Sequence, residues 1–405
     1  MRKLLNQGMT AYFRYAVIPK HPKGVLPMIY FDHAATTAVL PAAADAAYRV
    51  MTRDFGNPSS LHALGKQAAK EVETHRAAVA KALGCQPGEL FFTSCGTEGD
   101  NWAVQLAVHL GRHRGKHIIT TAVEHAAVLE PCKALEQQGY EVAYLTPDHT
   151  GRIPTEAVEA ALREDTILVS MMLVNNETGA IQPVAEVSQV LKGRRSSALL
   201  HTDAVQGFLK VPFTPKSLGA DLVTLSAHKI GGMKGSGALY IRSGLRAEPL
   251  IRGGGQEKGL RSGTEATPQI AAFAAAAELG YEHRENNIAY LKDLKAYALE
   301  TLQAKVPGLA VVAEGDAPHI CAVSLPGRPS QVVVRYLSDK GFCLSAGSAC
   351  HRGKASHVYG AMNLSKPVRD GMLRLSFAPS NTRDEVDALA EAMLSATREL
   401  VAAGR

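Results

Sequence analysis

The chain has 405 residues, of which 46% are hydrophobic and 20% are charged, so its composition is that of a globular protein and excludes a disordered or fibrous one. This length favours one large domain joined to one smaller domain. Five of the six net positive charges lie in residues 1–27, which leaves about +1 for the rest and gives no case for binding nucleic acid.

The N-terminal segment, residues 1–27, contains no acidic residue and lacks the continuous apolar core of a signal peptide. Met28 directly precedes a strand-like run at 29–31. We interpret residues 1–28 as a dispensable N-terminal extension, with an organellar targeting segment as the alternative. No run of about 18 apolar residues occurs, so we expect no transmembrane helix and no membrane partner.

Short apolar strands alternate with helices of ten or more residues between 41 and 280, which we predict to form the large domain. The predicted strands are 90–93, 117–120, 141–145 and 166–173, and the predicted helices are 68–83, 100–110, 126–138 and 155–162. This pattern is typical of an α/β fold whose mostly parallel sheet is covered by helices. Ligands of such sheets bind at the carboxyl ends of the strands.

Polar motifs follow four of the predicted strands in the large domain. Gly96 and Thr97 lie between a strand and a helix, where backbone N–H groups can hold a phosphate, although a plain capped turn has the same pattern. His125 comes just after the next strand, as a structural hydrogen-bonding group or as a proton carrier at a cofactor. The other two strand ends carry an amide at Asn176 and a carboxylate at Asp203.

Lys229 follows a β-type run at 221–225 and precedes a glycine-rich turn with Gly231, Gly232, Gly235 and Gly237. A lysine at the end of a strand can be desolvated and form a Schiff base, whereas a solvated loop lysine stays protonated. A buried carboxylate such as Asp203 needs a positive partner, which a protonated pyridine nitrogen would supply. Together the strand-end residues predict a site for pyridoxal phosphate.

The second region begins with a charged helical segment at 281–304. Strands at 320–325 and 373–377 and helices at 331–340 and 383–402 predict a smaller α+β domain, made of residues 29–40 and 281–405. Cys350 lies there among glycines and small residues, beside His351, Arg352 and Lys354, which favours a mobile loop and a reactive thiolate.

The remaining cysteines form no C-x-x-C pair and no zinc-ligand spacing. We therefore predict no metal site, free thiols and a reducing cytoplasm as the location. Cys95 is an additional thiol beside the predicted phosphate site, either a small residue in a tight turn or a redox group.

In their order along the chain, these motifs resemble cysteine desulfurases of the NifS/IscS kind, within the class V aminotransferase group of fold-type I pyridoxal-phosphate enzymes. The resemblance runs from Tyr30 to about Thr382 and includes residues 32–37, 55–60, 226–229, 261–264 and 346–350. It implies a homodimer with shared active sites, in which Thr264 reaches the phosphate bound by the partner subunit.

The resemblance also implies a role for each site residue. Lys229 would form the Schiff base with pyridoxal 5'-phosphate, Asp203 would pair with the ring nitrogen and His125 would stack on the ring. The remaining cofactor contacts would come from Gly96, Thr97, Asn176, Gln206, Ser226, His228 and Thr264. Asn176 and Arg374 would hold the substrate carboxylate, Arg374 through a bidentate guanidinium contact.

The reaction implied is the conversion of L-cysteine to L-alanine, with the sulfur held on Cys350 as a persulfide for a sulfur-acceptor protein. Lys229 would remove the α-proton, and His125 would donate or accept a proton. Iron–sulfur cluster assembly is one use of that sulfur, but the stretch from Cys350 to residues 356–358 is slightly shorter than in the housekeeping assembly members, so the acceptor stays open. A selenocysteine lyase, a class V aminotransferase and a non-catalytic sulfur-relay scaffold are the alternatives.

Overall fold

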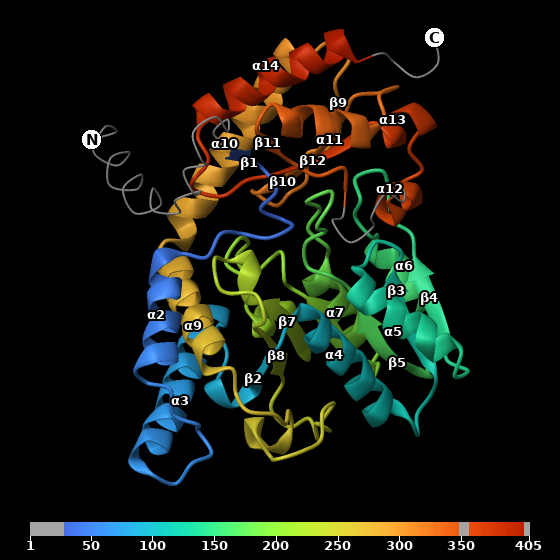
Figure 1. The fold of residues 1–405 in the computed structure, drawn as a ribbon. Helices are drawn as coiled ribbons and strands as arrows, with labels where there is room; N and C mark the ends of the chain where they lie inside the picture. The colour runs from blue at the N-terminus through green and yellow to red at the C-terminus, as the bar shows by residue number, and fades with distance from the viewer. Residues whose placement is uncertain (1–27, 348–355, 401–405) are drawn as a thin grey trace.

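The computed structural model describes residues 28–347 and 356–400. Figure 1 shows two layers, a lower one built around a long twisted sheet and an upper one with smaller sheets and helices of its own. None of the helices in the described part of the chain is long and apolar enough to cross a membrane.

The central sheet of the lower layer has seven strands. In spatial order they are β2 (Leu90–Thr93), β8 (Gly237–Ile241), β7 (Leu222–Ser226), β6 (Leu199–Asp203), β5 (Thr166–Ser170), β3 (His117–Thr121) and β4 (Glu141–Leu145). Strands β4, β3, β5, β6 and β7 are parallel, while β8 runs antiparallel to both of its neighbours. The predicted fold class, a mostly parallel sheet covered by helices, is confirmed.

Consecutive strand residues alternate between the two faces of this sheet, because side chains along a strand point to opposite sides. Ile119, Val169 and Val223 join the core under one face, and their neighbours Ile118, Leu168 and Leu222 join the core under the other. The covering helices are α2 (Pro41–Thr52), α3 (Ala63–Leu83), α4 (Gly96–Gly111), α5 (Ala126–Glu136), α6 (Thr155–Ala161), α7 (Val184–Gly193), α8 (Pro215–Leu218) and α9 (Thr267–Glu282). Helices α3, α7 and α9 cover the first face, and α4 and α5 cover the second.

The upper layer has its own apolar core, which contains Phe31, Leu294, Val323, Leu375 and Met393. Its strands are β1 (Ile29–Tyr30), β9 (Ala310–Ala313), β10 (Ile320–Ser324), β11 (Phe342–Cys343) and β12 (Met372–Ser376), and its helices are α10 (Arg284–Lys305), α11 (Ser330–Asp339), α12 (His357–Ala361), α13 (Lys366–Asp370) and α14 (Arg383–Glu399). Because β1 pairs with β11, the start of the described chain packs with its C-terminal part. On this basis we propose residues 41–280 as the large domain and residues 29–40 and 281–405 as the small one.

The strand expected at 166–173 ends at Ser170, and two further expectations at glycines also differ from the structure. Gly237 was expected to continue the glycine-rich turn, but it is the first residue of β8, where an added Cβ would lie 2.8 Å from the Leu225 carbonyl oxygen. The helix expected at 100–110 begins at Gly96, so the predicted phosphate-binding residues form its first turn. Glycine permits a close approach to neighbouring backbone at Gly237 and to the Val205 side chain at Gly96.

Candidate active site

The strand-end residues predicted from the sequence meet along one edge of the central sheet. Strands β3, β5, β6 and β7 are parallel, and β2 runs in the same direction as β7 because both are antiparallel to β8. Their carboxyl ends therefore lie on the side of the sheet that faces the upper layer (Figure 1). Gly96, His125, Asp203 and Lys229 come together there although up to 133 positions separate them in the chain.

Lys229 ends a short 3-10 turn that follows β7. Its Nζ donates hydrogen bonds to the carbonyl oxygens of Ala34 and Ala35, each at 2.7 Å. The preceding residue is held by the same N-terminal segment, since Thr37 N and Thr37 Oγ1 both donate to the His228 carbonyl oxygen. The lysine is thus held at the boundary between the two layers.

The His228 ring lies 3.1 Å from Thr36 Oγ1, measured from Nδ1. Burial lowers the pKa of His228 to about 4, and the charge of Lys229 acts in the same direction. The ring is therefore neutral at physiological pH, and it offers one donor and one acceptor nitrogen beside the amine.

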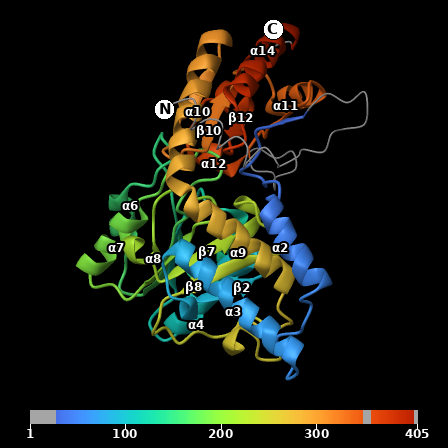
Figure 2. The same ribbon diagram turned by 90° about the vertical axis from the view of Figure 1, so that its left-hand side faces the viewer.

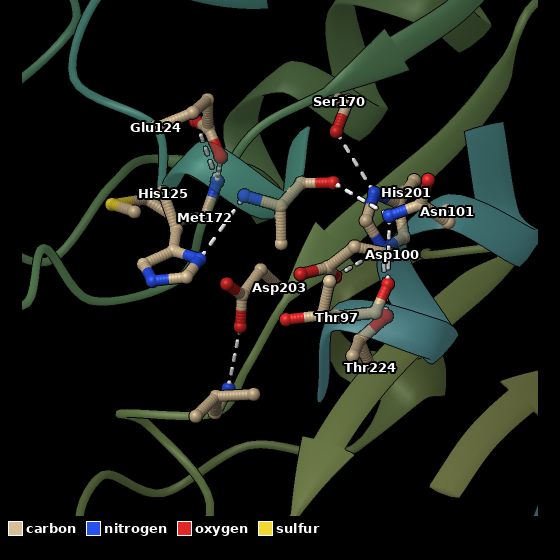
Figure 3. A network of polar contacts seen from close by, with 12 residues as sticks. Thr97, Asp100, Asn101, Glu124, His125, Ser170, Met172, His201, Asp203 and Thr224 are labelled. Atoms are coloured by element: carbon tan, nitrogen blue, oxygen red, sulfur yellow. Dashed lines mark hydrogen bonds and ion pairs between the residues drawn. The ribbon is translucent and has the colours of Figure 1, made fainter. Parts of the chain in front are cut away.

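Asp203 and His125 lie side by side at the ends of β6 and β3 (Figure 3). The Asp203 carboxylate is 7% exposed and accepts a hydrogen bond from Val205 N at 2.9 Å. Burial raises the pKa of Asp203, while the charges of His125 and Lys229 oppose that rise. His125 caps α5, because its Nδ1 accepts a hydrogen bond from Ala127 N at 3.2 Å, and this contact orients the ring.

Gly96 packs closely against the loop that follows β6 and against the end of β7. A Cβ added at Gly96 would lie 3.0 Å from Val205 Cγ2 and 3.6 Å from the Cβ of Ser226. Gly96 and Thr97 are the first residues of α4, whose leading N–H groups have no partner within the helix. The sequence therefore folds into a small cradle of backbone donors beside the buried Ser226.

The side chains at this edge fit pyridoxal phosphate. The buried Asp203 carboxylate suits a protonated ring nitrogen, and the α4 cradle suits a phosphate. Gln206 is 6% exposed, its Nε2 donates to the Ala34 carbonyl oxygen at 2.9 Å, and its Oε1 has no hydrogen-bond partner among the described residues. A polar group of the cofactor would satisfy that buried oxygen.

Arg374 reaches the site from β12 in the upper layer and is 1% exposed. Its Nη1 donates to the Asn176 carbonyl oxygen at 2.9 Å, and its Nη2 donates to Asp32 Oδ1 at 2.7 Å. The predicted neighbourhood of Asn176 and Arg374 is therefore present. The Asp32 contact was missed, because the sequence shows only that this acid begins the 32–37 motif.

A layer of buried polar residues behind Asp203 was also missed (Figure 3). His201 Nδ1 lies 2.8 Å from Ser170 Oγ, and His201 Nε2 lies 3.0 Å from Thr224 Oγ1 and 3.6 Å from Asp100 Oδ1. Burial lowers the pKa of His201 to about 3, and burial also raises the pKa of Glu124 to about 8. The available signal was a set of polar residues inside otherwise apolar strands.

Two predicted residues remain, Thr264 and Cys350. Thr264 is exposed, and it lies three residues after Arg261, whose guanidinium contacts Glu98 in the first turn of α4. Cys350 lies outside the described residues.

The comparisons with known proteins agree with this geometry. The aminotransferase class-V family matches residues 29–389. A cysteine desulfurase from Trichormus azollae is 41% identical over 374 residues, which cover 91% of this chain and 92% of that protein. The cysteine desulfurase IscS from Methanosarcina thermophila is 39% identical over 378 residues, which cover 92% of each chain.

Solved structures give the same result. A NifS-like protein superposes with a TM-score of 0.87 at 36% identity and covers 92% of this chain and 100% of its own. The NifS-like protein from Rickettsia africae superposes with a TM-score of 0.82 at 31% identity and covers 92% of this chain and 99% of its own. The chain therefore belongs to the aminotransferase class-V family of pyridoxal-phosphate-dependent enzymes and, within it, to the cysteine desulfurases.

Proposed function

We propose that this protein converts L-cysteine to L-alanine and transfers the sulfur to Cys350 as a persulfide, from which an acceptor protein collects it. The observation that supports this most is that Asp203 lies close to both His125 and Lys229 at one sheet edge, in a chain that is 41% identical to a cysteine desulfurase over 91% of its length.

In this proposal the cofactor is pyridoxal 5'-phosphate. Asp203 would hold the ring nitrogen, His125 would stack on the ring, and Gln206 would meet the phenolic oxygen. The phosphate would be held by residues of the cradle and of the turn after β7: Gly96, Thr97, Ser226 and His228. When bound, the cofactor supplies a conjugated ring that accepts the electron pair released at the α-carbon of the substrate.

The chain's own groups would orient the substrate and move its protons. Arg374 would bind the carboxylate of L-cysteine together with Asn176, in competition with its present Asp32 contact. Lys229 Nζ would take the α-proton, and the backbone carbonyls of Ala34 and Ala35 would hold the protonated amine. His125, whose Nδ1 accepts a hydrogen bond from Ala127 N, would donate or accept a proton at the substrate.

The sulfur transfer is balanced without another reagent. The Cys350 thiolate would attack the sulfur of L-cysteine, a new S–S bond would form and the bond between that sulfur and the β-carbon would break. The β-carbon would gain a proton, L-alanine would leave, and Cys350 would carry the added sulfur. Because the thiolate is the nucleophile, the cationic neighbours of Cys350 in the sequence would favour the step.

A short exposure to L-cysteine tests this proposal. After a brief pulse and alkylation of the protein, peptide mass spectrometry should find the mass of one added sulfur atom on the peptide that contains Cys350, together with free L-alanine. The peptides that contain Cys85 and Cys132 serve as internal controls. Sulfur distributed evenly over all the cysteines, or alanine formed without sulfur on Cys350, would contradict the persulfide role.

We also propose that the protein is a homodimer in which Thr264 of each chain reaches the phosphate site of the other. Thr264 is exposed, so a second chain can reach it. Large apolar side chains are exposed on α2 and on the segment after it, among them Met51, Phe55 at 66% and Leu61 at 88%. Exposed apolar groups of this size along one segment are typical of an interface.

The double substitution Phe55→Asp with Leu61→Asp should weaken the dimer, because two charges would be buried without partners. Sedimentation equilibrium should then show a mass near 43.1 kDa for the variant and about twice that for the unchanged protein. Val332, which is 48% exposed on α11, provides the control substitution Val332→Asp, which should leave the dimer intact. An unchanged protein that sediments as a monomer would contradict the proposal.

Finally, we propose a reducing cytoplasm as the location. The five described cysteines, Cys85, Cys95, Cys132, Cys321 and Cys343, are all free thiols. Proteins of oxidising compartments commonly join such thiols as disulfides, so free thiols favour a reducing one.

A further inference from the structure

Glu98 lies in the first turn of α4, directly beside the proposed phosphate cradle. Its Oε2 accepts hydrogen bonds from Ser94 N at 2.9 Å and from the Ser94 hydroxyl at 2.5 Å. Arg261 closes the contact from the other side, with Nε at 2.8 Å from Oε1 and Nη2 at 3.1 Å from Oε2. The side chains of this pair are only 10% (Glu98) and 19% (Arg261) exposed.

This carboxylate lies where a negative charge would compete with a phosphate. The start of a helix carries a partial positive charge and unpaired N–H groups, so it attracts any nearby anion, whether a side chain or a ligand. Burial alone would raise the pKa of Glu98, but the hydrogen bonds from Arg261 and Ser94 hold that pKa below its usual value. Glu98 is therefore ionised, and its negative charge is balanced by a guanidinium that stays protonated.

Arg261 is itself held in place by a second buried ion pair on the same segment. Glu257 accepts hydrogen bonds from Arg76 Nη1 at 2.6 Å, from Arg76 Nη2 at 2.8 Å and from Phe92 N at 2.9 Å. Its backbone has φ of 49°, a left-handed conformation that is uncommon outside glycine. Phe92 belongs to β2, the strand that leads into the cradle. The contact between Glu257 and Phe92 therefore joins the segment that carries Arg261 to this strand.

We propose that Arg261 is a positioning residue of the phosphate site: it neutralises Glu98 and holds that carboxylate against Ser94, so that the first N–H groups of α4 remain available to an anion. This inference rests on the proposed function, because it takes the cofactor phosphate as the ligand. Arg261 acts through Glu98 and through the charge balance of the cradle.

Removing Arg261 alone should weaken phosphate binding, and removing the charge of Glu98 as well should restore it. Arg261→Met would leave an ionised carboxylate without its cation beside a dianionic phosphate, and like charges at close range repel. Glu98→Gln keeps the size of the side chain and its contact with Ser94 but removes the charge. Adding Glu98→Gln to Arg261→Met should therefore restore most of the lost affinity, a coupling that a double-mutant cycle measures.

The test is calorimetric titration of the cofactor-free full chain with pyridoxal phosphate and, separately, with inorganic phosphate. Arg261→Met should weaken both affinities by roughly tenfold, and the double variant should recover most of that factor. The loss in Arg261→Met should shrink as salt is raised, because salt screens charge repulsion but does not repair a distorted site. Arg383→Met is the matched control, since Arg383 makes a similar two-oxygen contact with Asp293 on an exposed surface.

Each result has a separate meaning. If Arg261→Met binds inorganic phosphate as tightly as the unchanged protein, or if the single and double variants are equally weak at every salt concentration, the proposed role of Arg261 is wrong. If the unchanged protein binds neither pyridoxal phosphate nor phosphate, the proposed function itself fails. Thermal unfolding of each variant shows whether a loss of affinity comes from a loss of fold, and Glu98→Gln alone keeps the test open if Arg261→Met does not fold.

Discussion

Replacing Lys229 with alanine is expected to abolish the formation of L-alanine from L-cysteine and to remove the visible absorbance that arises when the cofactor is joined to this lysine. Lys229 Nζ is the amine that the Ala34 and Ala35 carbonyl oxygens position, so the substitution removes the group proposed to take the α-proton. Loss of a general base alone lowers rates by about 10²–10⁴-fold, and the loss of cofactor attachment adds to that.

The measurement combines an absorbance spectrum of the purified variant with an assay of alanine. Lys234→Ala is the matched control, because Lys234 is an exposed lysine of the same glycine-rich turn and should leave both signals unchanged. Circular dichroism checks that the two carbonyl oxygens released by the substitution do not unfold the protein. A Lys229→Ala variant that keeps the spectrum and the activity would overturn the assignment of this lysine.

Cys350→Ala is expected to separate cofactor binding from sulfur transfer. The variant should keep the visible absorbance of the unchanged protein, because Lys229, Asp203 and the α4 cradle are untouched. It should form L-alanine at least about 10³-fold more slowly, because the variant lacks the nucleophile that attacks the substrate sulfur and receives it.

The control for this variant is Cys343→Ala, seven positions earlier on β11, which should keep both the spectrum and the activity. Adding a reducing thiol after the cysteine pulse should release sulfide from the unchanged protein and none from Cys350→Ala. Normal alanine production by Cys350→Ala would exclude the persulfide mechanism and would favour direct release of sulfur from the substrate.

The strand-end residues were predictable because their order follows from local patterns. Short apolar strands with helices between them form parallel sheets, and the carboxyl ends of parallel strands share one edge. His125, Asp203 and Lys229 could therefore be placed together before any contact was known. The identity of the family was also readable from the sequence, through the order of its motifs, and the comparisons confirmed it.

The partners of the charged side chains could not be predicted in this way. Arg374 meets Asp32 across 342 positions, and Arg76 meets Glu257 across 181. From the sequence alone, each arginine could form an ion pair with any of the acidic residues of the chain, because nothing in the sequence around a carboxylate indicates which arginine it contacts. The choice depends on which helices and strands pack together, which is a property of the whole fold.

The sequence by itself thus determined the fold class, the family and the edge of the sheet where the site lies, because short-range periodicity and motif order depend on neighbouring residues. Only the tertiary structure decided that the Lys229 amine rests on the Ala34 and Ala35 carbonyl oxygens, and that Arg261 neutralises Glu98 at the cradle. Those contacts join segments more than 160 positions apart, and their geometry is set by the packing of the two layers and of the helices against the sheet.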